Sequence, residues 1–309
     1  MARLNLIFVF ALLLAVFSAP APLRAQSAYV ISDNATGTVL EESNGAKKRP
    51  IGSLTKIATA MVVLDWAEVR GGNINELATV PHSATQIATA QGVGLMPGDR
   101  ISLRDLLYAA LMQSDNVAAE TLADHVGRAL GGGSANATTV DFFVAQMNAL
   151  ARRLGMTRTR FVNAHGLDNL ERTEPYSTAA DQAKLTAYAM ANSAFRFYVS
   201  QKERKIAVET ATGPSAYLLR NTNELLGISD IDGVKTGTTA KAGQCVIISA
   251  ARPPESRQEG EQHIITPRRL NVVLLNSSNR FNEAASLLQR GWRLYDAWAA
   301  AGRPQKNAR

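Results

Sequence analysis

Hydrophobic and polar residues follow different patterns in successive parts of this chain. Short apolar runs typical of strands come first, at 28–32 and 38–41, and the turn-forming residues 33–37 between them predict a hairpin. In the middle of the chain the apolar residues recur at helical spacing, and glycines follow several of the expected helices. Strand-like runs then return at 205–210, 233–238, 244–251 and 270–275.

The apolar spacing predicts helices over 54–66, 106–112, 117–130, 140–154, 178–192 and about 281–300. Ser102 and Thr178 are each followed three residues later by an aspartate, which is typical of a capped helix start. Strands at both ends and helices between them predict an α+β fold: an antiparallel sheet in which the two chain ends meet, with a mainly helical subdomain inserted. We expect the polar segment 253–267 to form a long hairpin loop.

The two ends of the chain carry separate signals. Residues 1–25 combine Arg3, an apolar stretch at 6–17 and a small residue before the expected cleavage point, as in a secretory signal peptide. We therefore expect the mature protein to be secreted across the cytoplasmic membrane and to work in the periplasm or at the extracellular cell wall. The last helix, 281–300, lacks the Lys/Arg-rich face of a membrane-surface helix, so we expect it to pack in the core and expect no integral membrane segment in the mature chain.

Composition narrows the class of protein further. The chain has 309 residues, of which 46% are hydrophobic and 19% charged, as in globular proteins. Its net charge of +7 is spread over short basic runs without interleaved aromatic residues, so no nucleic-acid partner is expected. The only cysteine, Cys245, is expected to pack as a small hydrophobic residue, and the four histidines lie far apart. We therefore expect neither a metal nor another cofactor.

A serine and a lysine stand three residues apart where the first long helix is predicted to start. Side chains at this spacing share a helix face, so Ser53 and Lys56 can touch. A neutral lysine could take the proton of the serine and make it a nucleophile, and we expect the helix dipole and a second cation, Lys235, to lower the pKa of Lys56 towards that role. The alternative is that Ser53 only caps the helix and Lys56 is solvated.

A second motif, Ser114-Asp115-Asn116, lies between two predicted helices. A hydroxyl and an amide two residues apart in a loop can face one site together. Ser114 could then relay a proton to a leaving amine while Asn116 holds a substrate amide. The alternative is that both residues are helix caps.

A third motif, Lys235-Thr236-Gly237-Thr238, lies on a predicted strand. Its lysine and threonine hydroxyls offer a place for a carboxylate, and the glycine would let an extended peptide approach the backbone of an edge strand. The alternative is an edge strand protected by lysine.

Longer stretches surround these motifs: PIGSLTK (50–56), PGDRISLRDLL (97–107), NAHGLD (163–168), YST (176–178), RNTN (220–223) and DGVKTG (232–237). With them, almost the whole mature chain resembles the low-molecular-mass penicillin-binding proteins of the D-alanyl-D-alanine carboxypeptidase family. The resemblance implies a β-lactamase/transpeptidase-like fold: a five-stranded antiparallel sheet flanked by helices, with the inserted subdomain. It also implies one catalytic domain at 26–301, followed by a short polar tail at 302–309.

The resemblance further implies roles for the motif residues. Ser53 would be the acylated nucleophile and Lys56 its base, and the backbone amides of Ser53 and Thr238 would form the oxyanion hole. His165 and Asp168 match a loop of the family, but the sequence defines no role for them, and we expect both to be structural. The residues implied in catalysis are Ser53, Lys56 and Ser114, and those implied in substrate binding are Asn116, Lys235, Thr236, Gly237 and Thr238.

The implied activity is that of a serine-type carboxypeptidase, a hydrolase of cell wall biogenesis and cell shape that acts on D-Ala-D-Ala stem peptides of peptidoglycan and is trapped covalently by β-lactam antibiotics. A DD-endopeptidase that cuts D-Ala cross-links is the main alternative, because RNTN (220–223) and AGQC (242–245) also resemble those enzymes. A β-lactamase is disfavoured, since Glu171 and Glu174 do not stand in the E-x-x-L-N pattern of class A enzymes. A non-catalytic wall-binding module would have no need of a nucleophile beside two lysines.

Overall fold

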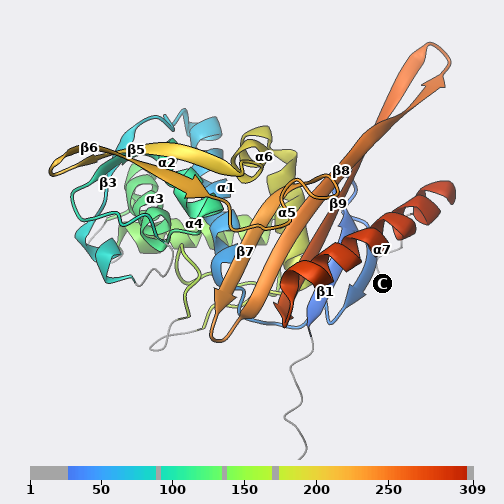
Figure 1. The fold of residues 1–309 in the computed structure, drawn as a ribbon, viewed down its shortest axis with the longest axis horizontal. Helices are drawn as coiled ribbons and strands as arrows, with labels where there is room; N and C mark the ends of the chain where they lie inside the picture. The colour runs from blue at the N-terminus through green and yellow to red at the C-terminus, as the bar shows by residue number, and fades with distance from the viewer. Residues whose placement is uncertain (1–26, 88–91, 134–137, 169–173, 305–309) are drawn as a thin grey trace, which may run out of the picture.

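The computed structural model describes residues 27–87, 92–133, 138–168 and 174–304, so the predicted signal peptide lies outside the described residues. Its main sheet is antiparallel, with the strand order β2-β1-β9-β8-β7 (Figure 1). The strands are β1 (Ala28–Asp33), β2 (Val39–Ser43), β7 (Ile231–Thr239), β8 (Gly243–Glu259) and β9 (Gln262–Ser277). The predicted five-stranded sheet is confirmed, and the two chain ends meet where β1 pairs with β9.

Helices cover both faces of the main sheet. The last helix runs along one face, and the helical subdomain lies on the other side (Figure 1). The helices are α1 (Thr55–Arg70), α2 (Leu103–Met112), α3 (Asn116–Ala129), α4 (Thr139–Arg153), α5 (Ala179–Ala191), α6 (Ser193–Val199) and α7 (Arg280–Ala300). The helices predicted from the sequence are confirmed, whereas α6 was not predicted.

Two predicted helix caps are also confirmed. The Ser102 side chain accepts a hydrogen bond from the backbone N–H of Asp105 at 3.1 Å, and Thr178 accepts one from Asp181 at 3.0 Å. These contacts satisfy backbone donors that have no partner within the first turn of a helix. The starts of α2 and α5 are therefore fixed by local sequence.

The short apolar run in the central strand β9 contributes side chains to both hydrophobic cores. Val272 and Leu274 pack with α7, whereas Val273 and Leu275 pack with the helical subdomain. Successive side chains on a strand point to opposite faces, so a strand buried on both faces is apolar without interruption.

A second antiparallel sheet lies in the inserted subdomain, in the order β3-β4-β5-β6. Its strands are β3 (Leu77–Thr79), β4 (Arg100–Ser102), β5 (Glu203–Thr210) and β6 (Gly213–Arg220). The predicted strand at 205–210 belongs to this sheet rather than to the main one. The sequence analysis missed β3 and β4, which are three residues long, and β6, which begins with Gly213 and Pro214.

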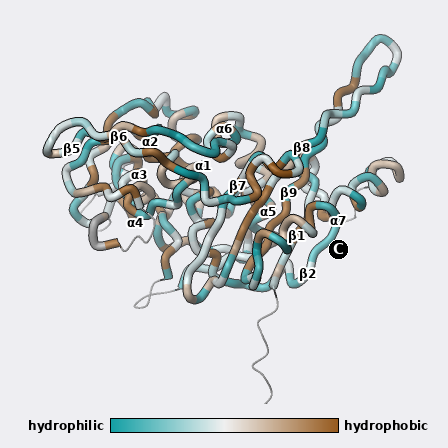
Figure 2. Tube along the Cα trace, viewed as in Figure 1, coloured by the Kyte–Doolittle hydropathy of each residue, from teal (hydrophilic) through white to brown (hydrophobic). Residues whose placement is uncertain are grey.

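The prediction of a loop over 253–267 is wrong, because β8 and β9 continue as a paired ribbon to a turn at Gly260 and Glu261. The ribbon extends well beyond the body of the molecule (Figure 1) and is mostly hydrophilic (Figure 2). The register shifts between Arg252 and Glu255, so the two intervening prolines lie at an irregularity where a missing N–H is tolerated. A polar strand exposed on both faces has no hydrophobic alternation by which to predict it.

Candidate active site

Ser53 lies in a 3₁₀ turn, η1 (Gly52–Leu54), that leads directly into α1. Its side chain does not cap that turn or helix, since neither start has a side-chain capping bond. Instead its Oγ lies 3.0 Å from Nζ of Lys56. The predicted contact between the two side chains is present, and the alternative that Ser53 only caps the helix is wrong.

Lys56 is fully buried, which excludes the alternative of a solvated lysine. Its Nζ donates to Oδ1 of Asn116 and to the backbone carbonyl of His165, both at 2.7 Å. A neutral amine has two N–H groups and one lone pair. The two carbonyl oxygens can take both N–H groups, which leaves the lone pair for the hydroxyl proton of Ser53.

Burial lowers the pKa of Lys56 to about 7, because an ammonium ion loses its hydration there, and the negative charge of Asp115 opposes this effect. Burial, rather than the expected helix dipole or Lys235, is the largest cause of the lowered pKa. A buried amine with a pKa near neutrality is a good general base at physiological pH.

The second motif contributes an amide and a cap. Asn116 is the first residue of α3 and contacts Lys56, whereas Asp115 caps the helix by accepting from the backbone N–H of Ala118 at 2.9 Å. The suggestion that Ser114 and Asn116 are the caps is therefore wrong. Ser114 is half-buried and has a φ of 66°, a left-handed conformation that is strained for a residue with a Cβ.

The third motif lies on β7, which forms one edge of the main sheet. Lys235 is fully buried and donates to the Thr236 carbonyl at 3.0 Å. Its pKa is well below the usual range because of burial, and the charges of Lys56 and Arg280 add to the effect. The Thr236 hydroxyl lies 2.7 Å from that of Thr222, so the strand is tied to the RNTN segment.

Gly237 has a packing role that the sequence analysis did not predict. A Cβ at this position would lie 2.8 Å from the carbonyl oxygen of Ile51 and 3.2 Å from the backbone nitrogen of Ser53. A Cβ on Gly52 would likewise lie 3.3 Å from the backbone nitrogen of Thr238. The glycine therefore lets β7 and η1 pack closely, which brings the two amides expected to form the oxyanion hole to one place.

Arg280, at the start of α7, was missed by the sequence analysis. Its guanidinium donates to Oγ1 of Thr238 at 2.7 Å and to the Gly237 carbonyl at 3.3 Å. The guanidinium places a positive charge at the end of β7, which suits a carboxylate ligand. A single arginine more than forty residues after the motif has no sequence signal that identifies it.

The loop that contains His165 supports Lys56 through its backbone. The imidazole itself accepts from the backbone N–H of Leu167 at 3.1 Å, and burial together with the charge of Lys56 lowers its pKa to about 3. Asp168 accepts from the backbone N–H of Lys241 at 3.1 Å. Both side chains therefore bind backbone N–H groups. His165 contacts Lys56 only through its backbone carbonyl.

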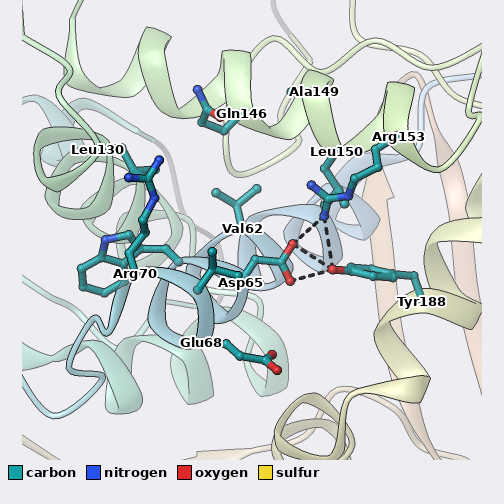
Figure 3. A pocket seen from close by; sticks show the side chains of 12 residues that line it. Val62, Asp65, Glu68, Arg70, Leu130, Gln146, Ala149, Leu150, Arg153 and Tyr188 are labelled. Atoms are coloured by element: carbon teal, nitrogen blue, oxygen red, sulfur yellow. Dashed lines mark hydrogen bonds and ion pairs between the residues drawn. The ribbon is translucent and has the colours of Figure 1, made fainter.

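Other features of the structure lie apart from the three motifs. No cluster of ligating side chains among the described residues could hold a metal ion. A surface pocket of about 490 Å³ lies between α1, α4 and α5, and it contains none of the motif residues. There Asp65, Arg153 and Tyr188 point toward one another and are joined by hydrogen bonds (Figure 3).

Cys245 is buried, as expected, and burial raises its pKa to about 11.

A serine–lysine pair at a helix start, packed against a Lys-Thr-Gly edge strand of an antiparallel sheet, defines the class of serine acyl-transfer enzymes that includes β-lactamases and penicillin-binding proteins. The sequence model of the D-alanyl-D-alanine carboxypeptidase family matches residues 15–257. The chain belongs to this family of serine hydrolases, and the enzyme class predicted from the sequence is confirmed.

Individual relatives have both of the expected activities. D-alanyl-D-alanine carboxypeptidase DacC of Escherichia coli is 32% identical over 94% of this chain and 68% of its own length. A D-alanyl-D-alanine endopeptidase of Pseudomonas aeruginosa is 32% identical over 72% of this chain and 66% of its own length. The crystal structure of the Streptomyces K15 DD-transpeptidase superposes with a TM-score of 0.72 at 30% identity, over 86% of this chain and 96% of that one.

Proposed function

We propose that this protein removes the terminal D-Ala of D-Ala-D-Ala stem peptides of peptidoglycan through an ester on Ser53. One observation carries the proposal: Oγ of Ser53 lies 3.0 Å from Nζ of a fully buried Lys56 whose other contacts are two carbonyl oxygens. This arrangement activates a hydroxyl that is otherwise a poor nucleophile.

Acylation would proceed in the following way. Lys56 takes the proton from Ser53 while Oγ attacks the carbonyl carbon of the penultimate D-Ala. The backbone N–H groups of Ser53 and Thr238 stabilise the oxyanion, and the tetrahedral intermediate then collapses and breaks the peptide bond. Ser114 relays a proton to the departing amine of the last D-Ala. Water hydrolyses the ester and returns Oγ to its starting state.

Substrate recognition follows from the free edge of β7. An extended peptide can pair with this edge, as in other cases in which a ligand adds a strand to a sheet. Lys235, Thr236 and Thr238 then bind the terminal carboxylate, with Arg280 beside them, and Asn116 holds the substrate amide. Gly237 keeps the strand close to the nucleophile. We include Arg280 on geometry alone, since its guanidinium already contacts the Thr238 hydroxyl.

β-Lactam antibiotics are proposed as covalent inhibitors that acylate Ser53. A structural neighbour, penicillin-binding protein D2 of Listeria monocytogenes, was solved in an ampicillin-bound form and is 28% identical with a TM-score of 0.66. A slowly hydrolysed ester at Ser53 would block the enzyme.

The place of action is proposed to be the periplasm or the extracellular cell wall. The support is the expected signal peptide at 1–25, followed by the catalytic domain at 26–301 and a short tail at 302–309. Among the residues that the structure describes, no helix is long and apolar enough to cross a membrane.

Endopeptidase activity on D-Ala cross-links is the second candidate, because endopeptidases of two species are 32% and 33% identical to the chain. Mass spectrometry of muropeptides separates the two activities, after incubation of the protein with pentapeptide monomers and cross-linked dimers. We expect D-Ala release with intact dimers, and no reaction with Ser53→Ala. Conversion of dimers to monomers would establish the endopeptidase, and an inactive wild-type protein would contradict both proposals.

A further inference from the structure

Asp115 makes contacts that a simple helix cap does not require. The residue is 0% exposed, and its two carboxylate oxygens bind backbone N–H groups of two separate segments. Oδ1 accepts from Ala118 in the first turn of α3 at 2.9 Å, and Oδ2 accepts from Val93 at 2.7 Å. A buried carboxylate shared by two segments fixes their relative position, because losing either bond would leave charge unsolvated.

The segment bound through Val93 is the loop 92–99. Its far end is fixed as well, since Asp99 accepts from the backbone N–H of Met96 at 2.8 Å and Gly98 donates to the Val80 carbonyl at 3.0 Å. The loop is therefore held at two points, and one of them is the residue between Ser114 and Asn116.

Contacts lead from this carboxylate to the nucleophile. Asn116 directly follows Asp115 and binds Nζ of Lys56 at 2.7 Å, and Nζ lies 3.0 Å from Oγ of Ser53. Ser114 directly precedes Asp115 and has a strained φ of 66°, a conformation that surrounding contacts must maintain.

We propose that Asp115 is a positioning residue for the acylation step: its carboxylate joins the loop 92–99 to the second motif and thereby holds Ser114 and Asn116 in their working positions. The inference rests on the proposed function, because it assigns Asp115 an effect on the acylation of Ser53. Asp115 does not touch the substrate or the reacting atoms in this account. It acts through its two neighbours and through its charge on Lys56.

The charge effect distinguishes this role from a merely structural one. Three titratable groups interact electrostatically with Lys56: Asp115 at the start of α3, His165 in its loop and Lys235 on β7. Asp115 is the anion among them and opposes the burial that lowers the pKa of Lys56. Removing the anion should lower this pKa further, so that Lys56 becomes neutral at a lower pH.

The test compares Asp115→Asn with Asp181→Asn in the full chain. Asp181 is a matched control, since it is a buried carboxylate in the first turn of α5 that accepts from the backbone N–H of Arg158 at 2.8 Å. The rate of acylation by a labelled penicillin is measured against pH, and the folded fraction is measured by circular dichroism. We expect Asp115→Asn to lose roughly ten- to a hundredfold in rate at pH 8. We also expect the acid limb of its pH profile to move down by about one unit.

A second variant separates the two effects and remains informative if Asp115→Asn fails to fold. Val93→Pro removes the N–H that the loop donates but leaves the buried charge in place. Its acylation rate should fall while the midpoint of the acid limb stays near the wild-type value.

The proposal is overturned if both variants acylate at the rate of Asp181→Asn, or if Asp115→Asn slows acylation without moving the acid limb. An unreactive wild-type protein would instead contradict the proposed function, so the two failures are distinguishable.

Discussion

At the scale of single residues, the site depends on one lysine that is buried more completely than lysines usually are. Lys56 tolerates this because three oxygen atoms surround Nζ and because the neutral form needs no counterion. Burial thus explains how Lys56, the proposed base, can be present as the neutral amine at physiological pH.

The first prediction concerns pH. Since the pKa of Lys56 is lowered to about 7, the ammonium form dominates below pH 7 and the neutral form above it. Only the neutral form can accept the proton of Ser53, so the acylation rate should rise through an acid limb with its midpoint near pH 7. Stopped-flow measurement of penicillin acylation from pH 5 to 9 checks this. A rate that is flat over that range would show that Lys56 is not the base.

A second prediction concerns Gly237. In Gly237→Ala the new Cβ would lie 2.8 Å from the Ile51 carbonyl oxygen, and this backbone atom cannot move without shifting η1. We expect a loss of about 1–3 kcal/mol in the free energy of unfolding, as for other overpacked sites, and a larger relative loss in acylation rate. Urea denaturation and acylation kinetics measure the two effects. Wild-type values for both would contradict the close packing of β7 on η1.

Residue types show why part of the site was predictable and part was not. In the proposed mechanism, Ser53, Lys56, Asn116 and Lys235 act through side chains, and the type and spacing of these residues carry the signal. His165 contacts Lys56 through its backbone carbonyl. Any residue could supply that group, so no residue type in the sequence identifies the position. Arg280 comes from a distant helix, and only the packing of α7 on β8 and β9 brings its side chain to the end of β7.

At the scale of elements, local sequence predicted most of the helices and the buried strands. Capping residues and apolar periodicity fixed α2 and α5, and the uninterrupted apolar run fixed β9. Exposed strands carry no such pattern, so β6 and the outer parts of β8 and β9 were missed. Their formation depends on pairing between segments, which the sequence of either segment alone does not encode.

A third prediction concerns the packing of α3 on α4. Burial raises the pKa of Glu120 to about 7, and the charges of Asp124 and Asp141 add to it. The folded state therefore binds more protons than the unfolded state between about pH 4.5 and 7, and stability should fall as the pH rises through this window. Glu120→Gln should remove this dependence and gain about 2 kcal/mol at pH 8, with little change at pH 5.

Thermal and urea unfolding at the two pH values check this prediction. Glu209→Gln is the control, since Glu209 is exposed in its ion pair with Arg100 and should change stability by less than about 1 kcal/mol. Equal effects of the two variants at pH 8 would contradict the assignment.

At the scale of the whole molecule, the β8–β9 ribbon is anchored at its base and free beyond it. Asp296 of α7 pairs with Arg252 and Arg268, and the Arg252 guanidinium lies 4.2 Å from the centre of the Trp292 ring. Glu255 also pairs with Arg268 and Arg303. The outer part of the ribbon adds little to either hydrophobic core.

A fourth prediction follows for that outer part. Replacing residues 256–265 by an Asn-Gly turn keeps the anchoring pairs and closes the hairpin with a favoured two-residue turn. We expect wild-type acylation kinetics and a melting temperature within about 3 °C of the wild type, because few buried contacts are lost. Loss of acylation in a folded deletion variant would show that the ribbon takes part in the site.

The whole account depends on Ser53 as the acylated residue, and mass spectrometry of the intact protein after incubation with a penicillin tests this directly. We predict one adduct per chain, located in the tryptic peptide that ends at Lys56, and no adduct on Ser53→Ala. An adduct that persists in Ser53→Ala, or that maps to Ser114, would contradict the account.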